Sequence, residues 1–188
     1  MMRRNLVVIG SSTGGPKILE EMLPTLPVLN AAVVIVQHIT PTIDRSLAAS
    51  LARISAMPVS LARDGQALNH GEILMAPGGL HLTLVNNSRI RLLNGERVNS
   101  VCPAIDVAMK SLENPAGARL VGVILTGMGR DGAEGLRHVK GLGGATVAQN
   151  QASSVIFGMP RAAIETGCVD QVLSTAAIGK YLREMKFP

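Results

Sequence analysis

The sequence predicts an α/β fold: a mostly parallel, doubly wound sheet with helices on both faces and a small antiparallel hairpin insertion. Apolar runs rich in β-branched residues, typical of strands buried on both faces, lie at residues 6–9, 32–37 and 120–125. These runs alternate with helical patterns, as β–α–β units do. Hydrophobic residues make up 47% of the 188 residues and aromatic ones only 2%. A core of Val, Ile, Leu, Ala and Met in one domain is therefore expected.

The first half of the chain alternates strand and helix and then breaks the alternation. A strand at residues 6–9 leads to a helix from Pro16 to about Leu26, because proline is favoured in a first helical turn. A strand at residues 32–37 is followed by a helix that Thr42 or Asp44 caps and that runs to about Ser55. Short strands are then expected at residues 58–62, 73–76, 80–85 and 89–93, the last two joined by a hairpin turn at Asn86-Asn87. We interpret these strands as an antiparallel insertion.

The second half of the chain returns to the alternating pattern. A helix is expected at residues 103–112, a buried strand at 120–125 and a helix at 133–140 that ends at the glycines of 141–144. A strand at 145–148, a short helix at 161–166 and a final helix at 175–185 complete the predicted fold. We found no internal repeat and no linker, so we expect residues 1–188 to form a single domain.

Composition excludes several classes of function. The formal net charge is +5, but the basic residues are scattered, Trp is absent, and two Phe and one Tyr are too few for a base-stacking surface, so we expect no nucleic-acid partner. No apolar run is long enough to span a membrane, and the run after the basic start is too short for a signal peptide. We therefore expect a cytoplasmic protein without membrane insertion. Cys102 and Cys168 match neither a metal spacing nor a CxxC motif, and are expected to be thiols rather than a disulfide.

A serine, a histidine and an aspartate follow the three most apolar strands. Ser12 follows the first strand within Gly10-Ser11-Ser12-Thr13-Gly14, a G-x-S-x-G pattern; His38 follows the second strand, and Asp131 follows the third. The carboxyl ends of parallel strands gather catalytic groups at one sheet edge, so we expect these three residues to meet as a Ser-His-Asp triad. Each residue alone has a structural alternative: Ser12 as a turn or cap residue, His38 as an ordinary strand-end histidine, and Asp131 as the N-cap of the next helix.

The residue types suit nucleophilic catalysis. A serine hydroxyl becomes a useful nucleophile when a base accepts its proton, which His38 can do near neutral pH, while Asp131 would orient and stabilise the imidazolium. The backbone N–H of Thr13 follows the serine near a helix start and can donate to an oxyanion, and a second donor can come from the loop at residues 126–129. The other histidines fit less well: His70 lies in a turn, His138 within a helix and His81 in the hairpin, although His81 can still reach the rim of the site.

Phosphate-binding motifs fit the glycine loop poorly. Pro16 separates Gly15 from Lys17, where a Walker A loop needs the lysine directly after the last glycine and then Ser or Thr. Ser12 occupies the place of the second glycine in a dinucleotide-binding G-x-G-x-x-G pattern. A nucleotide-binding module therefore remains only a minor alternative, and no metal or other cofactor is expected.

Five motifs, IGSSTGGP, VIVQHITP, LMAPGG, ILTGMGRDGAEGL and VAQNQASSVIFGMPRAAI, resemble the chemotaxis protein-glutamate methylesterase family, the CheB-type enzymes. The resemblance extends from about Leu6 to about Tyr181. It implies a parallel-sheet α/β domain that hydrolyses γ-glutamyl methyl esters on the cytoplasmic helices of chemoreceptors, with deamidation of receptor glutamines in some members. It also implies Ser12, His38 and Asp131 as the triad, with Thr13 and the Met128 backbone shaping the oxyanion site.

The chain departs from the family pattern in three ways. It has no room for the receiver domain that usually precedes the catalytic domain, so it is expected to be a free-standing catalytic domain or a fragment. Val101-Cys102-Pro103 stands where the family tends to have His-Arg-Pro, and Arg130-Asp131 where it usually has Asn-Asp. A binding module without turnover, or an esterase acting on a methyl ester outside chemoreceptors, remains the alternative.

Overall fold

Seven parallel strands form the central sheet of the computed structural model, which describes residues 5–114 and 117–187. The strand order is β3-β4-β2-β1-β7-β8-β9. The bounds are β1 Leu6–Ser11, β2 Ala32–Gln37, β3 Val59–Leu61, β4 Ile73–Met75, β7 Leu120–Ile124, β8 Ala145–Gln149 and β9 Gln171–Leu173. Every residue of β1, β2 and β7 is buried, as their uninterrupted apolar sequences predict. The predicted fold class is confirmed.

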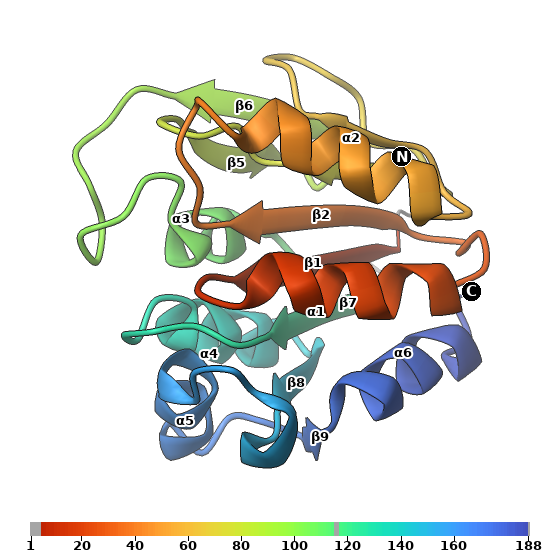
Figure 1. The fold of residues 1–188 in the computed structure, drawn as a ribbon, viewed down its shortest axis with the longest axis vertical. Helices are drawn as coiled ribbons and strands as arrows, with labels where there is room; N and C mark the ends of the chain where they lie inside the picture. The colour runs from red at the N-terminus through yellow and green to blue at the C-terminus, as the bar shows by residue number, and fades with distance from the viewer. Residues whose placement is uncertain (1–4, 115–116, 188) are drawn as a thin grey trace.

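Helices cover both faces of this sheet (Figure 1). Their bounds are α1 Gly15–Met22, α2 Asp44–Ile54, α3 Ile105–Lys110, α4 Ala133–Gly141, α5 Gly158–Glu165 and α6 Thr175–Glu184, with 3₁₀ turns η1 Leu23–Thr25 and η2 Gln151–Ser153. Alternate strand residues point to opposite faces, so Val7 and Ile9 of β1 pack with α1, α2 and α6, whereas Leu6 and Val8 pack with α3, α4 and α5. None of the described helices has the length and apolar character needed to cross a bilayer.

The strand order places a topological switch point beside β1. From β1 the sheet extends on one side through β2, β4 and β3, and the chain later returns to β7 on the other side of β1. Figure 1 shows the arrowheads of β2 and β7 pointing to the same side of the molecule, so the loops after these strands gather there. Ligand sites in open parallel sheets lie at such a point.

The antiparallel part is smaller than the sequence predicts. Residues 58–62 and 73–76 contain β3 and β4, which join the parallel sheet, and the antiparallel pair is β5 (His81–Val85) with β6 (Arg89–Leu93). Asn86 and Asn87 have φ of 50° and 49°, as a two-residue hairpin turn requires. β9 was not predicted, because this short, half-exposed edge strand has no apolar run.

Several helix starts also differ from prediction, and α3 begins at Ile105 rather than at residue 103. Helix α5 begins at Gly158 rather than at residue 161, because Gly-Met-Pro carries no recognisable capping signal. The N-cap of α2 is Ile43, with no side-chain cap; Asp44 is instead the first helical residue, and its carboxylate accepts the N–H groups of Arg45 and Gly78.

Candidate active site

Ser12 lies in a tight turn between β1 and α1. Its N–H donates to the Thr126 carbonyl at 2.9 Å, and its carbonyl accepts the N–H of Gly15 at 2.8 Å. Gly14 has φ of +83°, a backbone conformation that disfavours side chains, and a Cβ there would meet Val155 at 2.5 Å. A Cβ on Gly127 would meet the Ser12 Cβ at 2.7 Å. The small residues of both motifs therefore let the loop after β7 close against the serine.

His38 follows β2, and Gln37 joins it to the serine turn. The N–H of His38 donates to the Ser11 carbonyl at 2.9 Å. The Gln37 side chain, only 3% exposed, donates from Nε2 to the carbonyl oxygens of both Ser12 and His38 at 3.0 Å, and its Oε1 accepts the Ser11 hydroxyl at 2.6 Å. Sequence reasoning missed this role for Gln37. The available signal was a polar residue at the end of a wholly apolar strand, directly before the histidine.

The structure brings His38 and Asp131 into contact although 93 positions separate them in the sequence. His38 Nε2 lies 2.7 Å from Asp131 Oδ2, and the two side chains are 10% and 3% exposed. With Nε2 directed at the carboxylate, Nδ1 is the ring nitrogen left for the serine. Within the described part of the chain, no hydrogen bond joins Ser12 to His38; such contacts often tighten only when substrate binds.

Four donors surround the Asp131 carboxylate. Oδ2 accepts from His38 and, at 2.6 Å, from the N–H of Ile105; Oδ1 accepts from Asn99 Nδ2 at 2.9 Å and from the N–H of Asp106 at 3.1 Å. Burial of Asp131 opposes ionisation, but the hydrogen bonds, led by the one from His38, outweigh it and hold the pKa of this carboxyl below its usual range. Asp131 is thus kept as an anion, the form that can stabilise an imidazolium. The N-cap of α4 is Gly132, so Asp131 does not take the alternative role of helix cap.

Thr13 and Met128 lie on the two loops that meet at Ser12. Neither of their backbone N–H groups donates to an acceptor among the described residues. Thr126 joins the loops, because its hydroxyl donates to the Thr13 carbonyl at 3.0 Å and its N–H donates to the buried Gln149 side chain at 2.7 Å. Two backbone donors thus remain uncommitted on rigidly supported turns, as an oxyanion site requires.

The remaining histidines have structural partners. His81 is 4% exposed: its Nδ1 accepts the N–H of Ala104 at 3.2 Å, and its Nε2 lies 2.9 Å from the Glu96 carbonyl. His70 bonds with Asn30 and with the N–H of Asn5, and His138 bonds with the Leu112 carbonyl. In the described part of the chain, no three His, Cys, Asp or Glu side chains are arranged to hold a metal.

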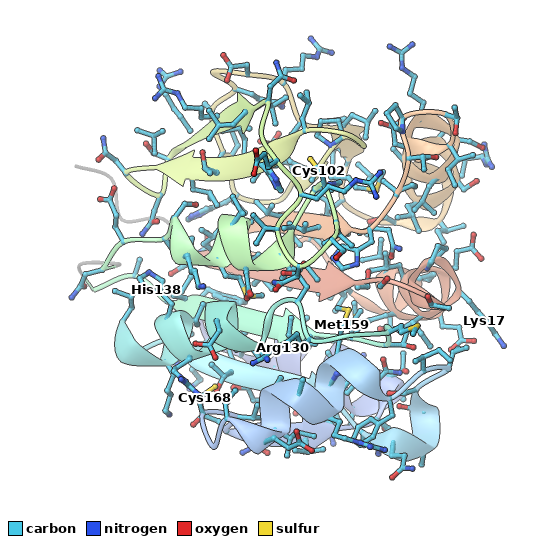
Figure 2. The ribbon with its side chains drawn as sticks, turned by 90° about the vertical axis from the view of Figure 1, so that its left-hand side faces the viewer. Lys17, Cys102, Arg130, His138, Met159 and Cys168 are labelled. Carbon is cyan, nitrogen blue, oxygen red and sulfur yellow. The ribbon has the colours of Figure 1, made fainter. Side chains whose placement is uncertain are left out.

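The departures from the family pattern lie near this edge of the sheet. Figure 2 shows Cys102 and Arg130 on the side of the molecule toward which the strands point in Figure 1. Both cysteines are free thiols, as predicted. Burial raises the pKa of the Cys102 thiol, and the Arg97 guanidinium partly opposes this. A separate hollow of about 720 Å³ between α2, β3 and the β5–β6 hairpin contains none of the three predicted catalytic residues.

Fold and site together define a class: α/β proteins that place a serine on a strand–turn–helix junction, beside a buried His–Asp pair, at the carboxyl edge of a parallel sheet. Comparison with known proteins identifies the family within this class. The sequence model described as CheB methylesterase matches residues 7–182. The chain therefore belongs to the CheB methylesterase family, and the resemblance inferred from its motifs is confirmed.

Relatives agree in sequence and structure. Proteins named protein-glutamate methylesterase/protein-glutamine glutaminase from Symbiobacterium thermophilum and Agrobacterium fabrum are each 45% identical, over 176 and 185 residues. The matches cover 93% and 97% of this chain but 49% and 53% of those relatives, so the chain spans about half their length. The crystal structure of the Thermotoga maritima CheB methylesterase catalytic domain is similar with a TM-score of 0.92 and 38% identity, covering 97% of this chain and 99% of that one.

Proposed function

We propose that this chain is a serine esterase that hydrolyses glutamate γ-methyl esters on the cytoplasmic helices of chemoreceptors and releases methanol. The observation that carries the proposal is the buried, hydrogen-bonded His38–Asp131 pair beside the turn that presents Ser12. Family membership supports the substrate class, since the curated relatives are named for this reaction. We further propose that residues 1–188 act as one catalytic domain in the cytoplasm, without metal or cofactor.

The proposed reaction passes through an acyl-enzyme. Ser12 Oγ forms a bond to the ester carbonyl carbon while its proton moves to His38 Nδ1. The N–H groups of Thr13 and Met128 donate to the oxyanion. When the C–O bond to the methoxy group breaks, His38 returns the proton to the departing oxygen and methanol leaves. Water then attacks the acyl-enzyme as His38 accepts its proton. His38 returns this proton to Oγ as the C–Oγ bond breaks, which frees the glutamate and restores the Ser12 hydroxyl.

The same machinery accommodates glutamine deamidation, for which the relatives are also named. Only the leaving group differs, since ammonia rather than methanol departs with the proton from His38. Throughout both cycles Asp131 keeps the imidazole oriented through Nε2 and stabilises it while it is charged.

Methanol release from chemoreceptor membranes carrying labelled methyl esters tests the proposal. We expect release with the unaltered chain and loss of nearly all release with Ser12→Ala. Ser60→Ala, at the exposed position of β3 and beside the hollow that contains none of the predicted catalytic residues, is the matched control and should behave like the unaltered chain. A serine-reactive fluorophosphonate provides a readout independent of substrate, because it should label Ser12 even if the true ester is not on a chemoreceptor. Labelling without methanol release would favour a different methyl ester, and absence of both from folded protein would favour a binding module.

A further inference from the structure

The loop between β6 and α3 ends in a tight turn that presents Asn99 to the site. Val98 and Val101 exchange two backbone hydrogen bonds of 3.1 Å, and the residues between them, Asn99 and Ser100, have φ of 52° and 66°. Asparagine tolerates this left-handed conformation better than most side chains. The turn therefore fixes the direction of the Asn99 side chain, which reaches the site from an exposed loop in which Asn99 is itself exposed.

The Asn99 amide bridges two buried carboxylates. Its Nδ2 lies 2.9 Å from Asp131 Oδ1 and 2.9 Å from Asp106 Oδ2, and the two aspartates are 2% and 5% exposed. An amide NH₂ group has two hydrogens, so it can donate to both oxygens at once. Each oxygen is within hydrogen-bond distance of the same nitrogen, so one amide group links the two carboxylates.

Each of the two aspartates also accepts backbone N–H groups at the start of a helix. Asp131 accepts the N–H groups of Ile105 and Asp106 at the start of α3, and Asp106 Oδ1 accepts those of Gly132 and Gly135 at the start of α4, at 3.0 and 2.7 Å. These donors come from the helix backbones. The bond from Asn99 occupies Asp131 Oδ1, which leaves Oδ2 directed at the Ile105 N–H and at the His38 ring.

We propose that Asn99 is a positioning residue for the triad: its side-chain amide holds the Asp131 and Asp106 carboxylates in place and so sets the oxygen that receives His38. This inference rests on the proposed catalytic roles of Ser12, His38 and Asp131, but it concerns the His–Asp pair alone. Two titratable side chains face Asp131. His38, from the loop after β2, contacts it directly, and Asp106, on α3, is linked to it by the Asn99 amide. Arg130 precedes Asp131 in the chain.

Three variants separate the amide from the turn. Asn99→Gly removes the amide and still allows a positive φ. Asn99→Asp has nearly the same shape but places a carboxylate where the donor stood. Ser100→Gly is the matched control, since it alters the neighbouring positive-φ residue, whose side chain makes no hydrogen bond among the described residues. Thermal unfolding establishes that each variant folds, and Asn99→Gly decides the question if Asn99→Asp does not fold.

The first readout needs no substrate. Nitrogen-15 NMR follows titration of the His38 ring, assigned by the signals lost in His38→Ala. Without the Asn99 donor, the negative charge on Asp131 is less well balanced and binds the imidazolium more strongly. We expect the His38 titration midpoint to rise by about one pH unit in Asn99→Asp, a tenfold change in proton affinity, by less in Asn99→Gly, and not at all in Ser100→Gly. An unchanged or lowered midpoint in both Asn99 variants overturns the inference.

The second readout is methanol release across pH. We expect kcat to fall about tenfold in Asn99→Asp with little change in KM, and the acid limb of the rate profile to move to higher pH. The two proposals can fail separately. A shifted His38 titration without methanol release in the unaltered protein leaves the role of Asn99 intact and removes the proposed substrate. Methanol release with an unshifted His38 titration supports the proposed substrate and overturns the role of Asn99.

Discussion

His38 and His81 are both largely shielded from solvent, yet the protein holds them in opposite ways. Both ring nitrogens of His81 face backbone groups, the N–H of Ala104 and the carbonyl of Glu96, so the ring joins the two ends of the loop that carries Asn99. His38 has one ring nitrogen on the Asp131 carboxylate, while Nδ1 has no partner among the described residues. A histidine with both nitrogens occupied cross-links the fold, whereas one oriented by a carboxylate on a single side is prepared to exchange a proton.

His38→Ala should produce the largest effect on this comparison. If His38 is the base, as proposed, its removal is expected to lower kcat by on the order of 10⁴- to 10⁶-fold, because the acceptor for the Ser12 proton is lost. The thermal midpoint should change little, since Asp131 keeps three other donors. Methanol-release rates and thermal unfolding on the same preparation check both parts. A variant that kept a tenth of the activity would show that His38 is not the base.

Asp131→Asn should cost about 10⁴-fold in kcat, by analogy with serine proteases, because an amide cannot hold the imidazole in the required tautomer. This variant tests the carboxylate that distinguishes His38 from His81. Rates measured over a range of pH will show the loss also where His38 is unprotonated. Near-full activity at any pH would mean that Asp131 is not the orienting acid.

Asp131 should also shape acid stability. Its pKa is lowered on folding, so its ionised form contributes stability in full above the ordinary value of 3.8, and this contribution is lost as pH falls through the lower folded pKa. The thermal midpoint of the unaltered protein should therefore fall across this acid range, and the fall should be shallower in Asp131→Asn. Equal slopes for the two proteins would contradict the assigned shift.

Gln37→Glu should have a smaller effect, about 10- to 100-fold on kcat. In the unaltered protein the carbonyl oxygens of Ser12 and His38 accept from Gln37 Nε2. The substitution keeps the shape of the side chain but places a carboxylate oxygen against these two carbonyl oxygens. Ser11→Ala, which removes only the hydroxyl donor to Gln37 Oε1, is the control and should lose less. Similar rates for the two variants would indicate that Gln37 supports the fold without aligning the two catalytic turns.

His81→Ala should give the smallest loss of activity and the clearest loss of stability. The buried N–H of Ala104 would lose its acceptor, at a cost of about 1–3 kcal/mol in the free energy of unfolding. Activity at a temperature where the variant is folded should stay within several-fold of normal. Denaturant unfolding and methanol release measure the two quantities. A loss of rate comparable to that of His38→Ala would end the distinction between the two histidines.

The strands that form the centre of the fold were predictable because their signal is local. β1, β2 and β7 are continuous apolar runs, and a residue that directly follows such a run lies at the carboxyl edge of a parallel sheet. Strand-end position, together with the G-x-S-x-G pattern and the residue types of a triad, selected Ser12, His38 and Asp131. The edge strand β9 and the start of α5 were missed, because their sequences are short and contain no capping or periodic pattern.

The supporting residues were beyond sequence reasoning for a different reason. Asn99 lies 32 positions from Asp131 in the chain, in a turn whose only local feature is an Asn-Ser pair with positive φ. Gln37 lies at the end of an apolar strand, and nothing in the sequence says which carbonyl oxygens its amide will reach. Their roles depend on side-chain directions, and these become defined only when the elements pack.

The sequence by itself determined the class of fold, the family, and which serine, histidine and aspartate stand at the strand ends, because burial patterns and motifs are properties of short segments. Only the tertiary structure decided that His38 presents Nε2 to Asp131 and that His81 is a cross-link. It also showed that Asp131 accepts backbone N–H groups at the start of α3, that Asp106 accepts those at the start of α4, and that the Asn99 amide lies between the two carboxylates. The physical reason is that hydrogen bonds have a range of about 3 Å and strict directions, so their partners are chosen by packing rather than by position in the chain.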